Sequence, residues 1–403
     1  MATRIPALVN PSMLRWAREE AGFSLEAAAE RAKITPQRLN AWECGETAPT
    51  LRQAEGLAAI YHRPYSVFCL SVPPPSEPVA AQRRRLPSIT PGQESPELRF
   101  ALRQMLAQRR IALWLADELG ESTDSFLFRI QLSEKPEAIG QRLREALGVS
   151  AEAQLKWRDE FQAWRVWREA VERLNVLVVQ FSNVPLQEVR GVSVLEFPAP
   201  VIGINIKEIT ASKPFTLIHE LVHLGLANAS EELPAIGERR PEPEWMNLER
   251  FAEEVTGAAL LPKASLSADP TVSDHNTASS WSFSAVRELA RRYKVTPLAM
   301  ITRLLRIGKC SPSAYRQWRI EWEAYLQAHP PKAAGGIATP AQKAVNRHGQ
   351  PFTRLVLEAL TRERITSLEA ARYLNLRYPH VEMLRRDLLF ALPMYSSESS
   401  GAP

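Results

Sequence analysis

Several features that define common protein classes are scarce or missing in this 403-residue sequence. It contains three cysteines, Cys44, Cys69 and Cys310, which lie far apart and form no C-x-x-C pair. A disulfide framework or a cysteine-based zinc site is therefore not expected. The sequence also lacks a glycine-rich nucleotide-binding motif, the apolar segment of a signal peptide and any apolar run of membrane-spanning length. We accordingly expect a soluble, cytoplasmic protein with no membrane partner.

Charge is present in moderate amounts, with a small positive excess. The 50 Lys and Arg residues outnumber the 45 Asp and Glu residues, which gives a formal net charge of +5 and a pI of about 9.1. Such an excess permits a polyanionic partner but does not require one. The composition is that of an ordinary globular protein, and the length suffices for about two to four domains.

Helix signals and breaks divide the chain into four parts. Residues 1–75 predict a helical domain, and residues 76–125 predict a Pro- and Arg-rich linker followed by a helix. Residues 126–330 combine helices with a small sheet, and residues 336–395 form a small helical module after a Gly-Gly hinge. The expected fold class is therefore α+β and mostly helical.

The predicted sheet comes from three short segments of β-branched residues between turn signals. A helix follows them, which starts near Ser212 and has Pro214 in its first turn. The three segments are 176–180, 192–196 and 201–206.

The most informative segment lies on that helix and reads His219-Glu220-Leu221-Val222-His223, an H-E-x-x-H motif. Residues four apart lie one turn apart on the same helix face, so both histidines can direct an imidazole at one metal ion. Glu220 leaves the helix on an adjacent side, where a carboxylate can serve as general base toward water. The alternative is a pair of ordinary histidines on a helix.

A third metal ligand is expected because catalytic zinc usually has three protein ligands. The next histidine after the motif is His275, too far along the chain for the extended three-histidine pattern. A carboxylate on the helix predicted over 247–260 is the better candidate. Glu249 and Glu253 share one face of it, and spacing alone favours Glu249 only slightly. His275 is one candidate for stabilising an oxyanion, with a structural role as the alternative.

Two strings resemble the ImmA/IrrE family of metallopeptidases. The first, KPFTLIHELVHL from Lys213 to Leu224, is similar to the family's aromatic-Thr-x-x-H-E-x-x-H-L segment. The second runs from Glu249 to Pro262, where the family has a helix that begins E-x-x-A and ends in an apolar run closed by proline. The preceding strands, with Arg190-Gly191 and residues 200–205, are also similar. The resemblance covers roughly residues 160–310.

This resemblance implies a zincin-like metallopeptidase domain with zinc (Zn2+) as its cofactor. In this register His219, His223 and Glu249 take the place of the family's metal ligands, and Glu220 takes the place of its catalytic base.

The sequence departs from the family at a few positions. Val222 replaces a common Gly, Glu253 replaces a common Asn, and Thr256 replaces a common Ala. None of these changes removes a ligand, although Glu253 leaves open which carboxylate binds the metal.

Residues 11–65 resemble the XRE (lambda-repressor-like) class of helix-turn-helix units. The resemblance rests on REEAGFSLEAAA from Arg18, on ITPQRL from Ile34 and on AWECGETAPT from Ala41. In such a unit the second helix of the motif enters the DNA major groove through its N-terminal residues. The candidate base-reading residues are Thr35, Gln37, Arg38 and Asn40.

The alternative for this unit is a protein-interaction or self-association domain. Residues 1–75 carry eight Lys or Arg against seven Glu, which is nearly neutral for a DNA-binding domain. The arginines between Arg83 and Arg110 could add phosphate contacts, and a solvated helix face with a linker explains them equally well.

Together the two resemblances imply a zinc-dependent endopeptidase that regulates transcription. Its substrate would be a repressor or antitoxin-like protein cut at a specific site, and its own N-terminal domain would bind double-stranded DNA. The alternative is a DNA-binding transcriptional regulator whose metal domain senses or binds without cleaving. The C-terminal module, which includes Ile365–Ala371, is interpreted as a substrate-binding or dimerising unit, so a homodimer remains an open expectation.

Overall fold

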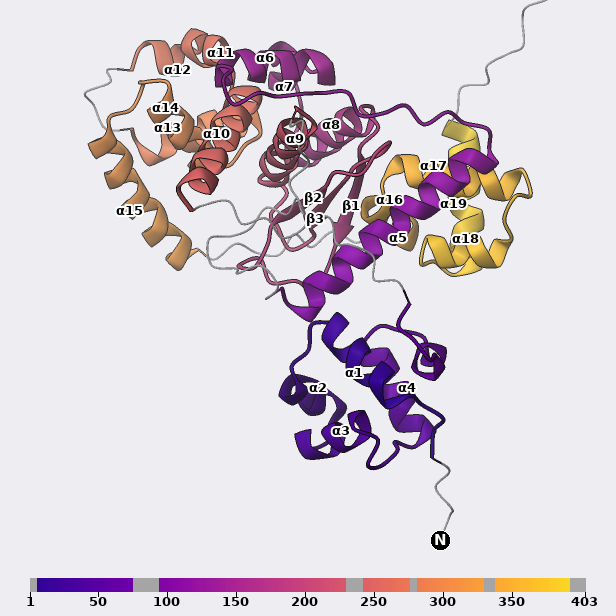
Figure 1. The fold of residues 1–403 in the computed structure, drawn as a ribbon. Coiled ribbons are helices and arrows are strands. Elements are labelled where there is room, and N and C mark those ends of the chain that lie inside the picture. The colour runs from indigo at the N-terminus through magenta and orange to yellow at the C-terminus, as the bar shows by residue number, and fades with distance from the viewer. Residues whose placement is uncertain (1–5, 75–93, 230–241, 276–280, 330–337, 392–403) are drawn as a thin grey trace, which may run out of the picture. The chain divides into compact units, whose positions relative to one another are not determined.

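The computed structural model describes residues 6–74, 94–229, 242–275, 281–329 and 338–391. These residues form an α+β fold that is mostly helical, with α-helices numbered α1 to α19 and one 3-stranded sheet (Figure 1). None of the described helices is both long and apolar enough to pass through a membrane.

Two features predicted from the sequence fall outside the described residues. They are the arginine cluster Arg83–Arg85 and the hinge Ala333–Gly336.

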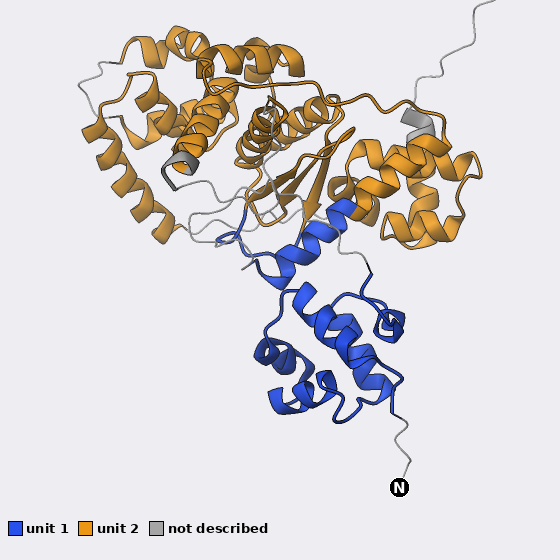
Figure 2. Cartoon of the chain, viewed as in Figure 1, with its two compact units in different colours: residues 1–80, 85–106, 182–189 blue, residues 81–84, 107–181, 190–403 orange. Residues whose placement is uncertain are grey.

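The chain divides into two compact units. Unit 1 comprises residues 1–80, 85–106 and 182–189, and the remaining residues make up unit 2 (Figure 2). The first part of helix α5 (Pro96–Glu118) belongs to unit 1, and its second part, from Ala107, belongs to unit 2.

Unit 1 is built from short capped helices, as the sequence predicts. Asn10, Ser24 and Thr35 each cap a helix by accepting a hydrogen bond from a backbone N–H in its first turn. An internal ion pair joins the first helix to the third, because the Arg18 guanidinium donates to both carboxylate oxygens of Glu43 at 2.8 and 3.0 Å. The helices are α1 (Pro11–Glu20), α2 (Leu25–Ala32), α3 (Pro36–Glu43) and α4 (Leu51–Ile60), followed by the 3-10 helix η1 (Tyr65–Cys69).

The arginines of α5 bind protein groups within their own units. Arg99 donates to the carbonyl of Glu19 at 3.2 Å, and Arg103 donates to the carbonyl of Tyr61 at 3.3 Å. Arg109 is buried and donates to the carbonyls of Ala199 and Phe197 and to the Glu196 carboxylate, at 2.6 to 2.8 Å. The suggested phosphate-binding face is therefore wrong for Arg109, and Arg99 and Arg103 already support internal packing.

The sheet of unit 2 lies at the centre of its packing and has the order β1-β3-β2. Strand β3 (Val201–Asn205) pairs in parallel with β1 (Leu177–Phe181) and antiparallel with β2 (Gly191–Val194). Every strand residue is buried. The three predicted strands are thus present, within two residues of their predicted ends.

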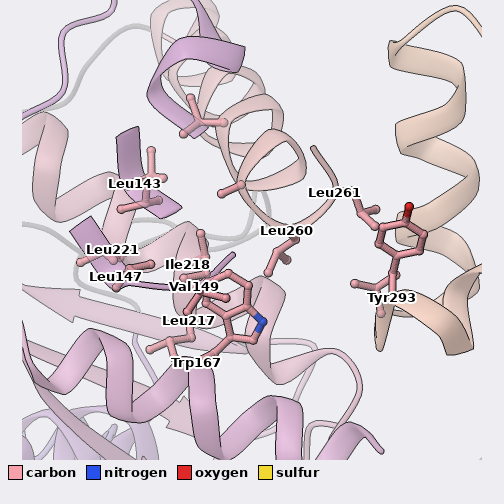
Figure 3. Close-up of a cluster of buried hydrophobic side chains, with 14 of the residues drawn as sticks. Leu143, Leu147, Val149, Trp167, Leu217, Ile218, Leu221, Leu260, Leu261 and Tyr293 are labelled. Carbon is pink, nitrogen blue, oxygen red and sulfur yellow. The ribbon is translucent and has the colours of Figure 1, made fainter. Parts of the chain in front are cut away.

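Four helices of unit 2 build the region around the sheet. Helix α9 (Lys213–Ala229) contacts β2 and β3, and it also contacts α8 (Glu160–Glu172) and α10 (Glu242–Leu260). Helix α6 (Pro136–Leu147) packs along α10. Figure 3 shows how apolar side chains from these helices meet, among them Leu143, Trp167 and Leu217. This core fixes where the polar residues of α9 and α10 lie.

The remaining helices of unit 2 follow in chain order. They are α7 (Ala151–Leu155), α11 (Lys263–Ala268), α12 (Pro270–Ser273), α13 (Phe283–Tyr293), α14 (Pro297–Arg306), α15 (Pro312–Ala328), α16 (Pro340–His348), α17 (Gln350–Thr361), α18 (Ser367–Tyr373) and α19 (Tyr378–Ala391).

A buried ion pair connects the C-terminal helices to the sheet. Arg168 donates to Glu172 at 2.9 Å, to the carbonyl of Asn346 at 2.7 Å and to the carbonyl of Val178 in β1. Burial raises the pKa of the Glu172 carboxyl to about 7, against the opposing charge of Arg168. Gly349 has a φ of +87°, and a Cβ there would lie 2.8 Å from a Glu172 carboxylate oxygen.

The close packing of α6 on α10 predicts a specific cost for adding one methyl group. A Cβ at Gly140 would lie 2.7 to 2.8 Å from Ala258 and the backbone nitrogen of Ala259. Gly140→Ala must therefore push the two helices apart, and we expect a loss of about 1–3 kcal/mol in the free energy of unfolding. Urea denaturation followed by circular dichroism measures this change.

Gly56→Ala is the matched control. Gly56 also lies within a helix, α4, but an added Cβ would meet nothing within 4 Å. Its substitution should stabilise unit 1 by about 0.5–1 kcal/mol. Equal unfolding midpoints for Gly140→Ala and the unaltered chain would contradict the close approach of α6 to α10.

Candidate metal centre

Helix α9 places the two histidines of the H-E-x-x-H motif on one face. The apolar residues Leu217, Ile218 and Leu221 are fully buried on its other sides. His219 is 0% exposed and His223 is half-buried, and their Nε2 atoms lie 2.9 Å apart. The Phe215 ring stacks near the His219 ring, with centroids 6.2 Å apart. The two imidazoles therefore converge on one point, as residues four apart on a helix can do.

Helix α10 adds a carboxylate to the same point. The Glu249 carboxylate lies 3.3 Å from Nε2 of His219 and 3.2 Å from Nε2 of His223. Burial alone would raise the pKa of Glu249, but hydrogen bonds with the two histidines outweigh it and lower that pKa below its usual range. Glu253, the other candidate, is exposed and does not join this group. The spacing of the sequence left both Glu249 and Glu253 as candidates for the third ligand. Because α9 contacts α10, Glu249 is the one that lies beside the two histidines.

The three side chains fit a zinc ion. Their ligand atoms all lie within 4.8 Å of one another. Among the described residues, no other group of three or more His, Cys, Asp or Glu side chains has this spacing. Tetrahedral zinc with bonds near 2.0–2.1 Å needs ligand atoms about 3.3 Å apart. Two imidazole nitrogens and one carboxylate oxygen are also the donors of catalytic zinc sites, which keep a position for water or substrate.

The predicted general base is held beside this group by the neighbouring strand. Ser193 of β2 donates a hydrogen bond of 2.9 Å to Oε2 of Glu220, and both residues are buried. A Cβ at Gly191 would lie 3.0 Å from Cγ of Glu220 and 2.4 Å from the methyl group of Thr216. Glycine at position 191 is therefore what lets β2 approach α9 closely enough for Ser193 to reach Glu220.

Ser193 was not singled out from the sequence, although a signal for it exists. Residues two apart in a strand face the same side of a sheet, so Gly191 and Ser193 both face α9. A single hydroxyl in the otherwise apolar segment 191–194 is the kind of residue that needs a hydrogen-bond partner once it is buried.

A second carboxylate fixes the start of α9. Glu208 is buried and accepts hydrogen bonds from Ser212 at 2.7 Å and from Thr216 at 2.9 Å. Arg190 lies 3.4 Å from the same carboxylate. A negative charge at a helix N-terminus is favourable, so Glu208 stabilises the helix that carries the motif.

His275 does not lie with the group formed by His219, His223 and Glu249. Its ring stacks on that of Trp281, with centroids 3.8 Å apart. The structural alternative for His275 is thus the better supported one.

The four candidate base-reading residues share the exposed side of α3 in unit 1. Thr35, Gln37, Arg38 and Asn40 are all exposed, whereas Leu39 and other apolar residues of the helix face the core. Thr35 caps the helix by accepting from the backbone of Arg38, and the Arg38 guanidinium lies over the Trp42 ring at 5.2 Å. Their side chains can therefore reach a partner without unfolding any part of the unit.

Two family models match the chain. Residues 14–68 match a helix-turn-helix model, and residues 171–305 match the model of the IrrE N-terminal-like domain. The second match contains the sheet, α9 and α10. The chain therefore combines an XRE-type helix-turn-helix unit with an ImmA/IrrE-like domain, as its sequence predicts. No curated protein and no solved structure matches the chain.

The geometry predicts that zinc retention depends on one glutamate of α10 and not on the other. Glu249→Ala removes a donor from the group and should weaken zinc binding by at least about a hundredfold, since even residues that only support ligands contribute tenfold to a hundredfold. Competition with a chromophoric chelator measures the affinity. Glu253→Ala removes the same charge from the same helix and should leave the affinity unchanged. The reverse order of effects would reassign the third ligand to Glu253.

Proposed function

We propose that this chain, with its helix-turn-helix unit and its IrrE N-terminal-like domain, is a zinc-dependent endopeptidase that also binds double-stranded DNA. The observation that carries the proposal is the position of Glu220. Its carboxylate lies on the helix of the two histidines, is held by Ser193 at 2.9 Å, and is not one of the three proposed ligands. A metal site that served only the fold would have no need of such a base.

The three proposed ligands would hold the zinc ion between α9 and α10. Zinc supplies Lewis-acid chemistry in such a site, because it lowers the pKa of water and polarises a carbonyl group. The side chains of Glu249 and His223 are 18% and 10% exposed, whereas that of His219 is fully buried. A substrate would therefore approach from the side of Glu249 and His223.

Glu220 would carry the protons of the reaction. As general base it takes a proton from the attacking water, and it then delivers that proton to the nitrogen of the leaving amine. The hydrogen bond from Ser193 to Oε2 of Glu220 would fix the orientation of the carboxylate. Ser193 is in this view a positioning residue, since it acts through Glu220.

The proposed substrate is a repressor or antitoxin-like protein, and cleavage would relieve repression. What supports this is the presence of a DNA-binding unit in the same chain as the peptidase-like domain. A cytoplasmic location agrees with both parts. The competing function is a regulator whose metal domain senses or binds without cutting, and it has the same ligands but no use for a positioned base.

Substitution of Glu220 should reduce cleavage and leave metal binding unchanged. Glu220→Gln keeps the shape of the side chain but removes the base, so we expect zinc to stay bound and cleavage to fall by about 10²–10⁴-fold. The test substrates are candidate repressor proteins with a helix-turn-helix, chosen from the genes next to the one for this chain, and mass spectrometry of the products follows the reaction. Undiminished cleavage by Glu220→Gln would contradict the assigned role. An intact substrate with the zinc-loaded unaltered chain would favour the sensing function.

Ser193→Ala tests the positioning step separately. We expect a lower kcat, by about tenfold, with little change in KM or zinc affinity, because Ser193 is buried and is not one of the three proposed ligands. Ser284→Ala, which removes an exposed hydroxyl from α13, should match the unaltered chain. A change confined to KM would show that Ser193 acts on substrate binding instead.

The proposed DNA contacts of α3 predict that substitutions in this helix weaken the affinity for DNA. Arg38→Ala should weaken binding to an operator duplex by about tenfold, the usual cost of a lost base contact. Arg52→Ala removes an exposed arginine from α4 of the same unit and should have a smaller effect. Fluorescence anisotropy at two salt concentrations measures both. Equal affinities for the two variants would move the DNA-binding surface away from α3.

A further inference from the structure

We propose that the C-terminal helices contain a second helix-turn-helix, formed by α18, α19 and the turn between them, and that it binds double-stranded DNA. Neither the fold nor the peptidase-like site assigns a role to these helices, which form the group α16 to α19 in Figure 1. The proposal rests on a comparison of α18 and α19 with α2 and α3 of unit 1. It does not depend on whether the metal site cleaves a protein.

The two turns have the same backbone geometry. After α2, Lys33 has a φ of 55°, and the N–H of Ile34 donates to the carbonyl of Ala29 at 3.0 Å. After α18, Asn375 has a φ of 49°, and the N–H of Leu376 donates to the carbonyl of Ala371 at 2.9 Å. In both cases a left-handed residue follows the first helix and the chain reverses through the same six-residue hydrogen-bonded loop.

The first helix of each pair also begins in the same way. Ser24 caps α2 and Thr366 caps α18, each by accepting from the backbone N–H three residues later. The residue before each cap is apolar and 5% exposed, Phe23 in one case and Ile365 in the other. A polar cap after a buried apolar residue fixes where each first helix enters the core.

Burial follows the same pattern through both helix pairs. In the first helices, Ala28 and Ala370 occupy the same position and are both 0% exposed. In the second helices, Leu39 corresponds to Val381, both 0% exposed, and Trp42 at 2% corresponds to Leu384 at 5%. The same faces thus pack inward, so the outward face of α19 corresponds to the outward face of α3.

The exposed residues of this face suit a DNA partner. In the alignment set by the turns, Arg377 stands at the position of Thr35 and His380 at that of Arg38. Arg377 and Arg386 are exposed, and Tyr378 is 51% exposed. One acidic residue of α19, Glu382, is already paired with Arg385 at 2.8 Å. Arginine at the start of a recognition helix can reach guanine or phosphate in the major groove.

Charge separates the C-terminal module from unit 1. Residues 338–391 contain nine Lys or Arg against five Asp or Glu, whereas the first 75 residues are nearly neutral. Phosphate neutralisation supplies much of the affinity of DNA-binding proteins. The basic residues are Lys343, Arg347, Arg354, Arg362, Arg364, Arg372, Arg377, Arg385 and Arg386.

A protein partner is the competing occupant of this face. Leu368 and Met383 are 80% and 41% exposed, and exposed apolar residues are common at protein interfaces. The exposed arginines Arg377 and Arg386 favour DNA, because neutralisation of phosphate groups supplies much of the affinity for DNA. If DNA binds this face, substitution of its arginines should weaken binding. If a protein binds it, substitution of Leu368 and Met383 should do so, and an experiment can tell the two apart.

The test uses the full chain with Gln37→Ala and Arg38→Ala, which silence the proposed base-reading helix of unit 1. A labelled duplex of mixed sequence is titrated at low salt and followed by fluorescence anisotropy. Adding Arg377→Ala and Arg386→Ala should weaken the remaining binding by at least about tenfold. The matched control adds Lys343→Ala and Arg347→Ala, which remove two exposed positive charges from α16 and should change the affinity by less than about threefold.

Equal affinities for the two charge-matched variants would overturn the proposal, and so would the absence of any remaining binding in the Gln37→Ala, Arg38→Ala chain. Failure of Arg38→Ala to weaken binding would count against the DNA contacts proposed for α3 and leave this comparison intact. If Leu368→Ser and Met383→Ser alter the sedimentation of the chain while the arginine variant binds DNA normally, the face binds protein instead.

A second measurement needs no variant and therefore no assumption about folding. The unaltered chain is cross-linked by light to a duplex that contains bromodeoxyuridine, and the attached peptides are identified by mass spectrometry. Cross-links within α18 or α19 are expected. Cross-links confined to residues of unit 1 would overturn the proposal.

Discussion

The position of helix α10 is the constraint on which the metal group depends. Its Glu249 must meet two histidines of another helix at the spacing of zinc ligands, and small shifts of either helix would separate them. Gly140 allows α6 to pack tightly along α10, and Arg144 of α6 donates at 2.7 Å to the carbonyl of Ala259 near the end of α10. A buried charged donor at a helix C-terminus satisfies carbonyls that have no partner within the helix. Glu249 is thus held by contacts with residues more than a hundred positions away.

How much the sequence predicts depends on how local each feature is. The helix with His219 and His223 follows from the spacing of polar and apolar residues within one segment, and so do the strands. The choice between Glu249 and Glu253 needed the crossing of α9 and α10, because both residues lie on one face of the same helix. Ser193 depends on how closely a strand approaches a helix, which spacing within β2 alone does not reveal.

Arginine has two roles in this chain, and composition does not distinguish them. Arg18, Arg109 and Arg168 are buried and bind carbonyl or carboxylate oxygens inside the fold. A guanidinium with five donors can join several main-chain segments at once, so these residues act as internal crosslinks. The positive net charge of the sequence is therefore a poor guide to nucleic-acid binding. Exposed arginines, such as Arg38 of unit 1 and Arg377 of the C-terminal module, can still reach a partner.

The contact of Arg168 and Gly349 with strand β1 has a consequence for dividing this protein into parts. The outward carbonyl of Val178 accepts a hydrogen bond from Arg168, and a Cβ at Gly349 would lie 2.9 Å from it. A sheet edge without such cover offers unpaired main-chain groups to other chains and promotes aggregation. A fragment limited to the matched residues 171–305 would lack both Arg168 and α16 and would expose β1. A fragment that keeps β1 covered must therefore extend beyond residues 171–305 to include Arg168 and α16.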